Sequence, residues 1–152
     1  MRPARGEARD ISDAQYRMLS EFRFQIRNFL RFSEETVRGS GLEPQQHQLL
    51  LMLKGLPEGI RPNITAISGR LCLRHHTTVE LVNRLAERGA VVRTHSAEDR
   101  REVLVEITEI GEELLRRLSD SHWEELRKQG PALAEALDEL LAHSGESAEK
   151  HR

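Results

Sequence analysis

Apolar side chains recur every three or four residues along the N-terminal quarter of the chain, which predicts one long amphipathic helix. Ser12 or Asp13 can cap its start, and Gly39-Ser40-Gly41 ends it. A second helix is predicted between Pro44, which suits a first helical turn, and Pro57. The apolar positions are Tyr16, Leu19, Phe22, Ile26, Phe29, Leu30 and Val37 in the first helix, and Leu49, Leu50, Met52, Leu53 and Leu56 in the second.

Two shorter helices follow, joined by a tight turn at Cys72-Leu73-Arg74. Asn63 or Thr65 can cap the first of them, which turns Ile67 and Leu71 inward. The next helix runs from about His75 to Arg88 and is closed by Gly89. Its inward positions are Thr78, Leu81, Val82 and Leu85, and its outward positions are His75, His76, Val79, Glu80 and Asn83.

The hydrophobic period then changes to two over residues 91–94 and 103–107, which predicts a two-stranded ribbon with a charged tip at residues 96–101. Thr108 can cap a fifth helix that continues to Leu126. Gly130-Pro131 then starts a sixth helix with Leu133, Leu137, Leu140 and Leu141. The fold class predicted from this order is mainly α with a small β-wing.

Composition narrows the class of protein further. A chain of 152 residues with 38% hydrophobic and 32% charged residues can bury one core. Its longest apolar run, residues 49–53, is too short for a membrane span, and no signal peptide is evident, so we expect a cytoplasmic protein. Cys72 is the only cysteine, which excludes an internal disulfide and a cysteine-rich zinc site.

The charges are unevenly distributed, although the formal net charge is only −2. Residues 60–106 hold eight Arg or Lys against six Asp or Glu, together with His75, His76 and His95. Residues 107–152 hold six against eleven, so the acidic excess lies in the C-terminal third. Because a local basic face matters more than net charge, the middle of the chain remains able to bind nucleic acid.

The order helix, short turn, helix and ribbon is the winged helix-turn-helix plan. The major groove of DNA, about 12 Å wide, admits one helix, and the preceding helix sets its angle. The ribbon reaches the neighbouring minor groove, where an arginine can enter the narrow negative channel. Arg101 at the ribbon tip suits that role, with Asp99 holding its side chain, and Arg100 suits a phosphate.

Three segments carry a resemblance to the MarR family of bacterial transcription regulators. Residues 71–89, which read LCLRHHTTVELVNRLAERG, resemble the family's turn and recognition helix. Asp99-Arg100-Arg101, with residues 103–108 and Gly111, resembles its wing and the junction that follows. Gly41-Leu42-Glu43-Pro44 resembles the start of its second helix. The resemblance covers roughly residues 12–142.

The resemblance implies a homodimer that binds a pseudo-palindromic operator in double-stranded DNA. Residues 11–38 and 108–143 would form a helical dimerisation platform in which the first, fifth and sixth helices interlock. Residues 40–107 would form the DNA-binding lobe, with a disordered tail at 1–10 and a flexible tail at 144–152. The family implies a nucleoid-associated repressor, released by a small aromatic or lipophilic effector that binds between platform and lobe.

Several residues depart from the family pattern. Arg74 stands where a Ser or Thr usually caps the recognition helix, His75 and His76 replace small residues, and Cys72 replaces the turn glycine. The predicted DNA-binding residues are Arg74, His75, His76, Thr77, Val79, Glu80, Asn83 and Arg84 on the recognition helix, and Arg93, Asp99, Arg100 and Arg101 on the wing.

Three features of the sequence each allow two interpretations. Glu80 either accepts from a cytosine amino group or pairs with Arg84. Cys72 is either a redox switch or, by default, a small buried side chain. The aromatic residues of the first helix form either dimer core or an effector pocket, for which the candidate residues are Phe22, Phe29 and His47.

No arrangement of residues supports catalysis, a cofactor or a metal centre, since the chain lacks a glycine-rich phosphate loop and any nucleophile–base or metal-ligand spacing. We therefore expect a DNA-binding regulator and not an enzyme. The alternative is a helical protein-interaction module that uses its winged lobe for protein contacts.

Overall fold

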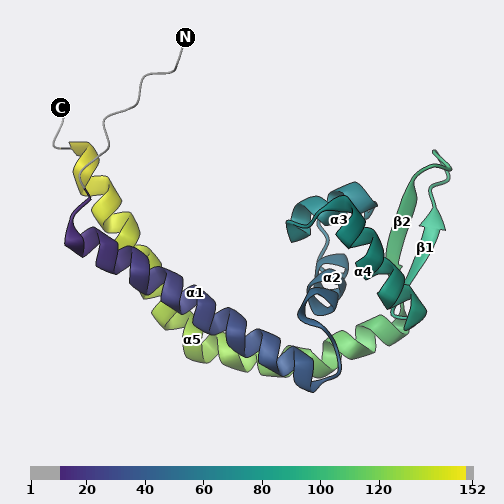
Figure 1. The fold of residues 1–152 in the computed structure, drawn as a ribbon, viewed down its shortest axis with the longest axis horizontal. Helices are drawn as coiled ribbons and strands as arrows, with labels where there is room; N and C mark the ends of the chain where they lie inside the picture. Colours follow the sequence, from purple (N-terminus) through teal and green to yellow (C-terminus); the bar gives the residue numbers. More distant parts are fainter. Residues whose placement is uncertain (1–10, 150–152) are drawn as a thin grey trace, which may run out of the picture. The chain divides into compact units, whose positions relative to one another are not determined.

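The computed structural model describes residues 11–149, so the predictions for residues 1–10 and 150–152 lie outside the described residues. The fold is mainly helical with one two-stranded antiparallel sheet, which confirms the predicted fold class (Figure 1). The elements in chain order are α1 (Asp13–Gly39), α2 (Pro44–Lys54), α3 (Ile64–Leu71), α4 (His75–Glu87), β1 (Val91–His95), β2 (Val103–Ile107) and α5 (Glu109–Glu149).

The chain divides into two compact units, and α1 and α5 each run through both. The helical unit consists, among the described residues, of 11–32 and 124–149. Within it, Asn28 of α1 donates to Gln129 of α5 at 3.3 Å. The winged unit consists of residues 33–123 and holds α2, α3, α4 and the β1–β2 ribbon.

Local capping explains where several helices begin, as the sequence predicts. The backbone N–H of Ser12 donates to the Gln15 side chain at 2.9 Å, and the Ser12 hydroxyl accepts from the Gln15 N–H at 3.3 Å. Asn63 Oδ1 accepts from the N–H of Ala66 at 2.9 Å at the start of α3. The second helix is shorter than predicted, because it ends at Lys54 with Gly55 as its cap and leaves Leu56 outside.

The prediction of a sixth helix is wrong, because α5 continues through Pro131. A proline inside a helix removes one backbone hydrogen bond and frees the carbonyl four residues earlier, here that of Arg127. Both Pro131 and Arg127 are exposed, so water can satisfy that carbonyl while the helical period of the leucines continues. The helix also includes residues 144–149, which lie in the predicted flexible tail at 144–152.

The core of the winged unit lies between α2, α3, α4 and one face of the ribbon. Val91 pairs with Ile107 and Arg93 with Val105, so that Val91 and Val105 face inward while Val92 and Thr94 face outward. The inward positions predicted for α4 are confirmed, since Thr78, Leu81, Val82 and Leu85 are all buried. The fully buried side chains include Leu42, Leu49, Leu50, Ile67, Leu85, Val91 and Val105.

The first turn of α5 lies directly on the end of α4. Thr108 donates its hydroxyl to the Gly89 carbonyl, its N–H bonds the Ala90 carbonyl at 3.1 Å, and its hydroxyl accepts from the Gly111 N–H at 3.2 Å. A Cβ on Gly111 would lie 2.2 Å from the oxygen of Ala90 and 2.7 Å from Ile107 Cγ1. Only glycine allows this close approach.

Two histidines stack inside the winged unit. The rings of His47 on α2 and His122 on α5 lie 4.6 Å apart at an angle of 9°. His122 Nδ1 donates to the Leu118 carbonyl at 2.8 Å, and its Nε2 forms a hydrogen bond with the Ser33 hydroxyl at 2.9 Å. His47 is 4% exposed, and its Nδ1 has no hydrogen-bond partner among residues 11–149. Burial, with a smaller contribution from the charge of His122, lowers the pKa of His47 from 6.5 to about 4.

We expect Gly111→Ala to lower the free energy of unfolding by about 1–3 kcal/mol, because the new methyl group must displace backbone or Ile107. Gly69→Ala in α3 is the control, since nothing lies within 4 Å of its Cβ position. The control should raise stability by about 0.5–1 kcal/mol through helix propensity. Urea unfolding measures both, and an unchanged stability of Gly111→Ala would contradict the close approach.

The stacked pair predicts a loss of stability in acid. The unfolded chain binds a proton at His47 below pH 6.5, whereas the folded chain does so only near pH 4, so stability falls as the pH drops through this window. From pH 7.5 to pH 5 the loss from His47 should be about 2 kcal/mol. His47→Phe keeps a stacked ring and removes the titrating group, so its unfolding free energy should depend less on pH by that amount. His143→Gln, which removes an exposed histidine of α5, is the control. Equal pH slopes for wild type and His47→Phe would contradict this account.

Candidate nucleic-acid interface

A hydrogen-bonded contact between α3 and α4 sets the angle of the helix pair. Ser68 of α3 donates to the Thr78 hydroxyl at 2.9 Å, and Thr78 donates to the Arg74 carbonyl at 3.1 Å. Thr78 is fully buried, so this chain of bonds lies in the core between the two helices. It holds the start of α4 against α3 and leaves the opposite face of α4 turned outward.

The turn between the helices contains a strained residue. Cys72 has φ 54° and ψ 40°, the left-handed conformation that favours glycine, and it is the only non-glycine residue with positive φ in the described part of the chain. Its side chain is exposed, so the interpretation of Cys72 as a small buried side chain is wrong. Its Sγ lies 3.9 Å from the Gly69 carbonyl in the last turn of α3.

The first turn of α4 has no side-chain cap. Arg74 occupies the N-cap position, as the sequence predicts, but makes no capping hydrogen bond. Arg74, His75 and His76 are exposed, and Thr77 is half-buried. Free backbone N–H groups and the positive end of the helix dipole form an environment that favours a phosphate.

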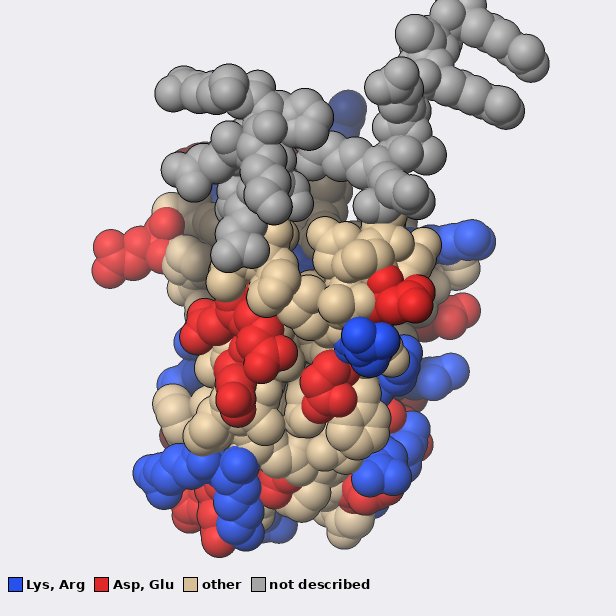
Figure 2. Space-filling model, turned by 90° about the vertical axis from the view of Figure 1, so that its left-hand side faces the viewer, with Lys and Arg blue, Asp and Glu red and all other residues tan. Residues whose placement is uncertain are grey.

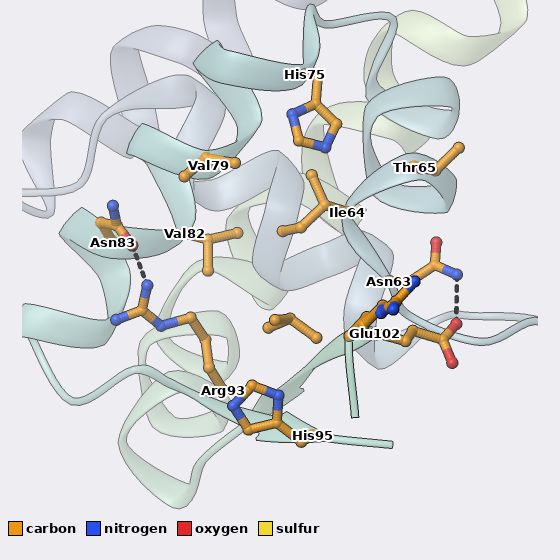
Figure 3. A pocket seen from close by; sticks show the side chains of 12 residues that line it. Asn63, Ile64, Thr65, His75, Val79, Val82, Asn83, Arg93, His95 and Glu102 are labelled. Atoms are coloured by element: carbon orange, nitrogen blue, oxygen red, sulfur yellow. Dashed lines mark hydrogen bonds between the residues drawn. The ribbon is translucent and has the colours of Figure 1, made fainter. Parts of the chain in front are cut away.

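A hollow of about 690 Å³ lies between α4 and the ribbon (Figure 3). His75, Val79 and Asn83 line one side, because residues four apart share one face of a helix. Arg93 and His95 of β1 and Arg101 of the wing loop line the opposite side. Asn83 accepts a hydrogen bond from the Arg93 guanidinium, which connects the two walls (Figure 3).

The wing loop differs from the prediction in one contact. The sequence predicts that Asp99 holds the side chain of Arg101, but Asp99 Oδ1 accepts from the backbone N–H of Arg101 at 2.9 Å. The Asp99 carbonyl accepts from the N–H of Glu102 at 3.0 Å, so Asp99 shapes the turn itself. The guanidinium of Arg101 forms no ion pair with any described residue, and Arg100 and Arg101 are both exposed.

The hollow brings together only part of the predicted DNA-binding set. His75, Val79, Asn83, Arg93 and Arg101 line it. The other predicted residues are Arg74, His76, Thr77, Glu80, Arg84, Asp99 and Arg100, which lie outside its lining. Glu80 and Arg84 are both exposed and form no ion pair with each other in the structure, so the pairing interpretation of Glu80 is not supported.

The three effector candidates lie in different units. Phe22 and Phe29 are half-buried on α1 in the helical unit. His47 is buried on α2 in the winged unit, where it stacks on His122. None of the three lines the hollow between α4 and the ribbon.

Sequence reasoning missed a group of residues around the base of the wing. Asn63 and Glu102 line the hollow, and Arg61 makes ion pairs with Glu98 and Glu102. Their connection joins the segment before α3 to the wing loop, almost forty residues later. No sequence signal pointed to Arg61, because Glu98 and Glu102 have Arg100 and Arg101 as nearer cationic neighbours along the chain.

Two further classes of site can be examined among residues 11–149. No helix of this part of the chain has the length and hydropathy needed to cross a membrane. No group of three or more His, Cys, Asp or Glu side chains in it is placed to hold a metal ion. Figure 2 shows blue and red side chains interspersed on the face it presents, rather than one continuous basic surface.

Comparisons with known proteins agree with this geometry. Residues 40–102 match the MarR family, and no curated protein sequence matches the chain. AbsC, a MarR family transcriptional regulator from Streptomyces coelicolor, has the same fold with a TM-score of 0.74 and 21% identity, over 94% of this chain and 97% of its own.

Two further solved structures are similar. Sco3205, a MarR family transcriptional regulator from Streptomyces coelicolor in complex with DNA, has a TM-score of 0.73 and 19% identity, covering 94% of this chain and 92% of its own. CouR from Rhodococcus jostii RHA1, bound to p-coumaroyl-CoA, has a TM-score of 0.64 and 23% identity, covering 93% and 95%. At these identities the similarity establishes the fold. The winged helix-turn-helix segment, residues 40–102, matches the MarR family, and the chain as a whole has the fold of these MarR family structures.

Proposed function

We propose that this protein is a homodimeric transcriptional regulator that represses by binding a pseudo-palindromic operator and is released by a small-molecule effector. The observation that carries the DNA-binding part is the hollow between α4 and the ribbon. Its walls hold Arg93 and Arg101 on one side and the outward stripe of α4 on the other. A recognition helix and a wing that border one concave surface can bind adjacent grooves of one duplex.

Each part of this surface has a separate role in the proposal. The exposed side chains of α4, above all His75, His76 and Glu80, bind base edges in the major groove. The uncapped N–H groups at the start of α4 bind a phosphate. Arg101, free of any described ion pair at the tip of the wing, enters the minor groove, and Arg100 binds the backbone.

The proposed dimer rests on the exposed apolar surface of α1 and α5. Tyr16 and Phe24 of α1 are 58% and 53% exposed, and Leu141 of α5 is 61% exposed. Large apolar side chains so exposed along two helices mark an association surface. The further exposed members are Leu19 and Leu30 on α1, and Trp123, Leu126 and Leu137 on α5. A second copy of the chain would cover them, and two winged units suit a two-fold symmetric operator.

The proposed effector response has weaker support. CouR is bound to p-coumaroyl-CoA, and the DNA binding of BpsR from Bordetella bronchiseptica is regulated by 6-hydroxynicotinic acid. By this analogy an aromatic acid or its ester would act here. Phe22, Phe29 and His47 remain the proposed effector residues.

Arg101→Ala tests the wing. We expect a loss of about 1–3 kcal/mol in binding to the duplex that the wild type enriches from a random-sequence pool, because one groove contact is removed. Arg116→Ala, which removes an equally charged and exposed side chain from α5, is the control. Fluorescence anisotropy at fixed salt measures both, since affinity for DNA depends steeply on ionic strength. Equal losses in the two variants would show that the wing does not bind the groove, and failure of the wild type to enrich any sequence would contradict sequence-specific DNA binding.

Leu141→Asp tests the dimer. We expect this variant to sediment as a monomer and to lose cooperative binding to a palindromic duplex. The double variant Leu137→Asp, Leu141→Asp should show both effects more strongly. Leu51→Asp on α2 is the control, because Leu51 is a leucine of the winged unit whose exposure (50%) lies between those of Leu137 (40%) and Leu141 (61%). Sedimentation velocity gives the answer. A wild type that sediments as a folded monomer would overturn the proposed assembly.

A further inference from the structure

The segment that precedes α3 lies along the outer edge of the wing. The N–H of Val105 donates to the Pro62 carbonyl at 2.9 Å, and Asn63 forms an isolated antiparallel bridge with Leu104. The ribbon therefore has a short third member beside β2, supplied by residues that lie before the helix-turn-helix in the sequence. This pairing places the side chains of residues 61–63 next to the base of the wing loop.

Arg61 joins the two ends of the wing loop. Its Nη1 lies 2.8 Å from Glu98 Oε2, and its Nη2 lies 2.9 Å from Glu102 Oε2. Nη2 also donates to the Ser96 hydroxyl, which in turn accepts from the N–H of Glu98 at 3.2 Å. Ser96 follows β1 and Glu102 precedes β2, so a single guanidinium connects both strands where the loop begins and ends.

Glu102 has a second partner on the same segment. Asn63 Nδ2 donates to Glu102 Oε1 at 2.7 Å (Figure 3). Because Asn63 Oδ1 caps α3, one amide side chain connects the wing to the first helix of the helix-turn-helix. The backbone closes the loop as well, since the Ser96 N–H donates to the Glu102 carbonyl at 3.0 Å.

The two ion pairs of Arg61 contribute differently to the stability of the wing. The side chain of Glu98 is 81% exposed, so its pair with Arg61 contributes little to stability. The side chain of Glu102 is only 19% exposed, and without Arg61 its carboxylate would keep Asn63 alone as a side-chain partner. A partly buried carboxylate that loses its cation is destabilised more than an exposed one. Loss of Arg61 therefore disturbs the base of the wing.

The carboxylates of the wing loop oppose its approach to DNA. Residues 96–102 hold Glu98, Asp99 and Glu102 against Arg100 and Arg101, so the loop carries more negative than positive charge. Those carboxylates would repel the phosphates that the arginines attract. Arg61 contacts two of the three and offsets the excess.

We propose that Arg61 is a positioning residue of the wing, which holds the loop and offsets its carboxylates so that Arg101 can reach DNA, without binding DNA itself. This inference rests on the proposed DNA-binding function. It gives a role in DNA binding to a residue outside the recognition helix and the wing. It also makes the effect of Arg61 on DNA affinity depend on the presence of Arg101.

A double-mutant cycle separates this role from a direct phosphate contact. Wild type, Arg61→Ala, Arg101→Ala and the double variant are titrated at fixed salt with the duplex that the wild type enriches from a random pool. We expect Arg61→Ala to weaken binding about tenfold in the wild type and by less than about twofold in the Arg101→Ala background. Arg116→Ala, an exposed ion-paired arginine of α5, controls for the loss of one positive charge.

A second measurement needs no DNA. Hydrogen exchange of the Val105 and Ser96 amides reports on the pairing at the base of the wing. Arg61→Ala should speed the exchange of both amides by about tenfold or more and leave the exchange of the α2 amides unchanged. Arg101→Ala should leave the exchange of Val105 and Ser96 unchanged. Arg61→Lys should restore only part of the protection, since a single ammonium cannot fork between two carboxylates.

The outcomes are distinct. Faster exchange together with non-additive losses of affinity supports the positioning role. Unchanged exchange in Arg61→Ala overturns it, and so do additive losses, which would show that Arg61 acts independently of Arg101. If the wild type enriches no duplex, the proposed function fails, and the exchange of Val105 and Ser96 alone decides whether Arg61 holds the wing.

Discussion

The contact between Ala90 and Gly111 determines how the winged unit is assembled. At this point α4 has ended, β1 begins, and the first turn of α5 lies close enough to exclude any Cβ on Gly111. Thr108 bonds both Gly89 and Ala90, so the end of α4 and the end of the ribbon are held by the same residue. The relative placement of α4 and the ribbon, and hence the shape of the hollow between them, follows from this junction.

Two other contacts complete the surface. The Ser68–Thr78–Arg74 hydrogen bonds set the angle of α4 against α3, and they leave its His75–Val79–Asn83 stripe facing the hollow. At the far end of the ribbon, Arg61 and Asn63 hold the base of the wing loop. Both ends of the ribbon are thus held by residues outside the strands. These contacts matter because an isolated two-stranded ribbon would be only marginally stable.

Local signals in the sequence were sufficient for most of the fold. Asn63 and Thr108 cap their helices within three residues along the chain, and the period-two pattern of residues 91–94 and 103–107 predicted the two-stranded ribbon. Pro131 was misread because a proline is a local breaking signal, whereas the leucine period on both sides maintains the helix. The sequence correctly paired Asp99 with Arg101 but predicted a contact with the guanidinium, whereas Asp99 accepts from the Arg101 backbone N–H. Sequence spacing alone does not distinguish these two donors of Arg101. Arg61 could not be found, since its partners lie 35–41 residues away and meet only in the fold.

In the proposed function, α4 and the wing together form the DNA-binding surface. Backbone amide chemical shifts of the full-length protein, recorded as the selected duplex is added, test it most directly. We expect large changes at His75, Val79, Asn83, Arg93 and Arg101, and small ones at the exposed face of α2 around Leu51. Changes concentrated on α2, or absent from the wing while present on α4, would contradict it.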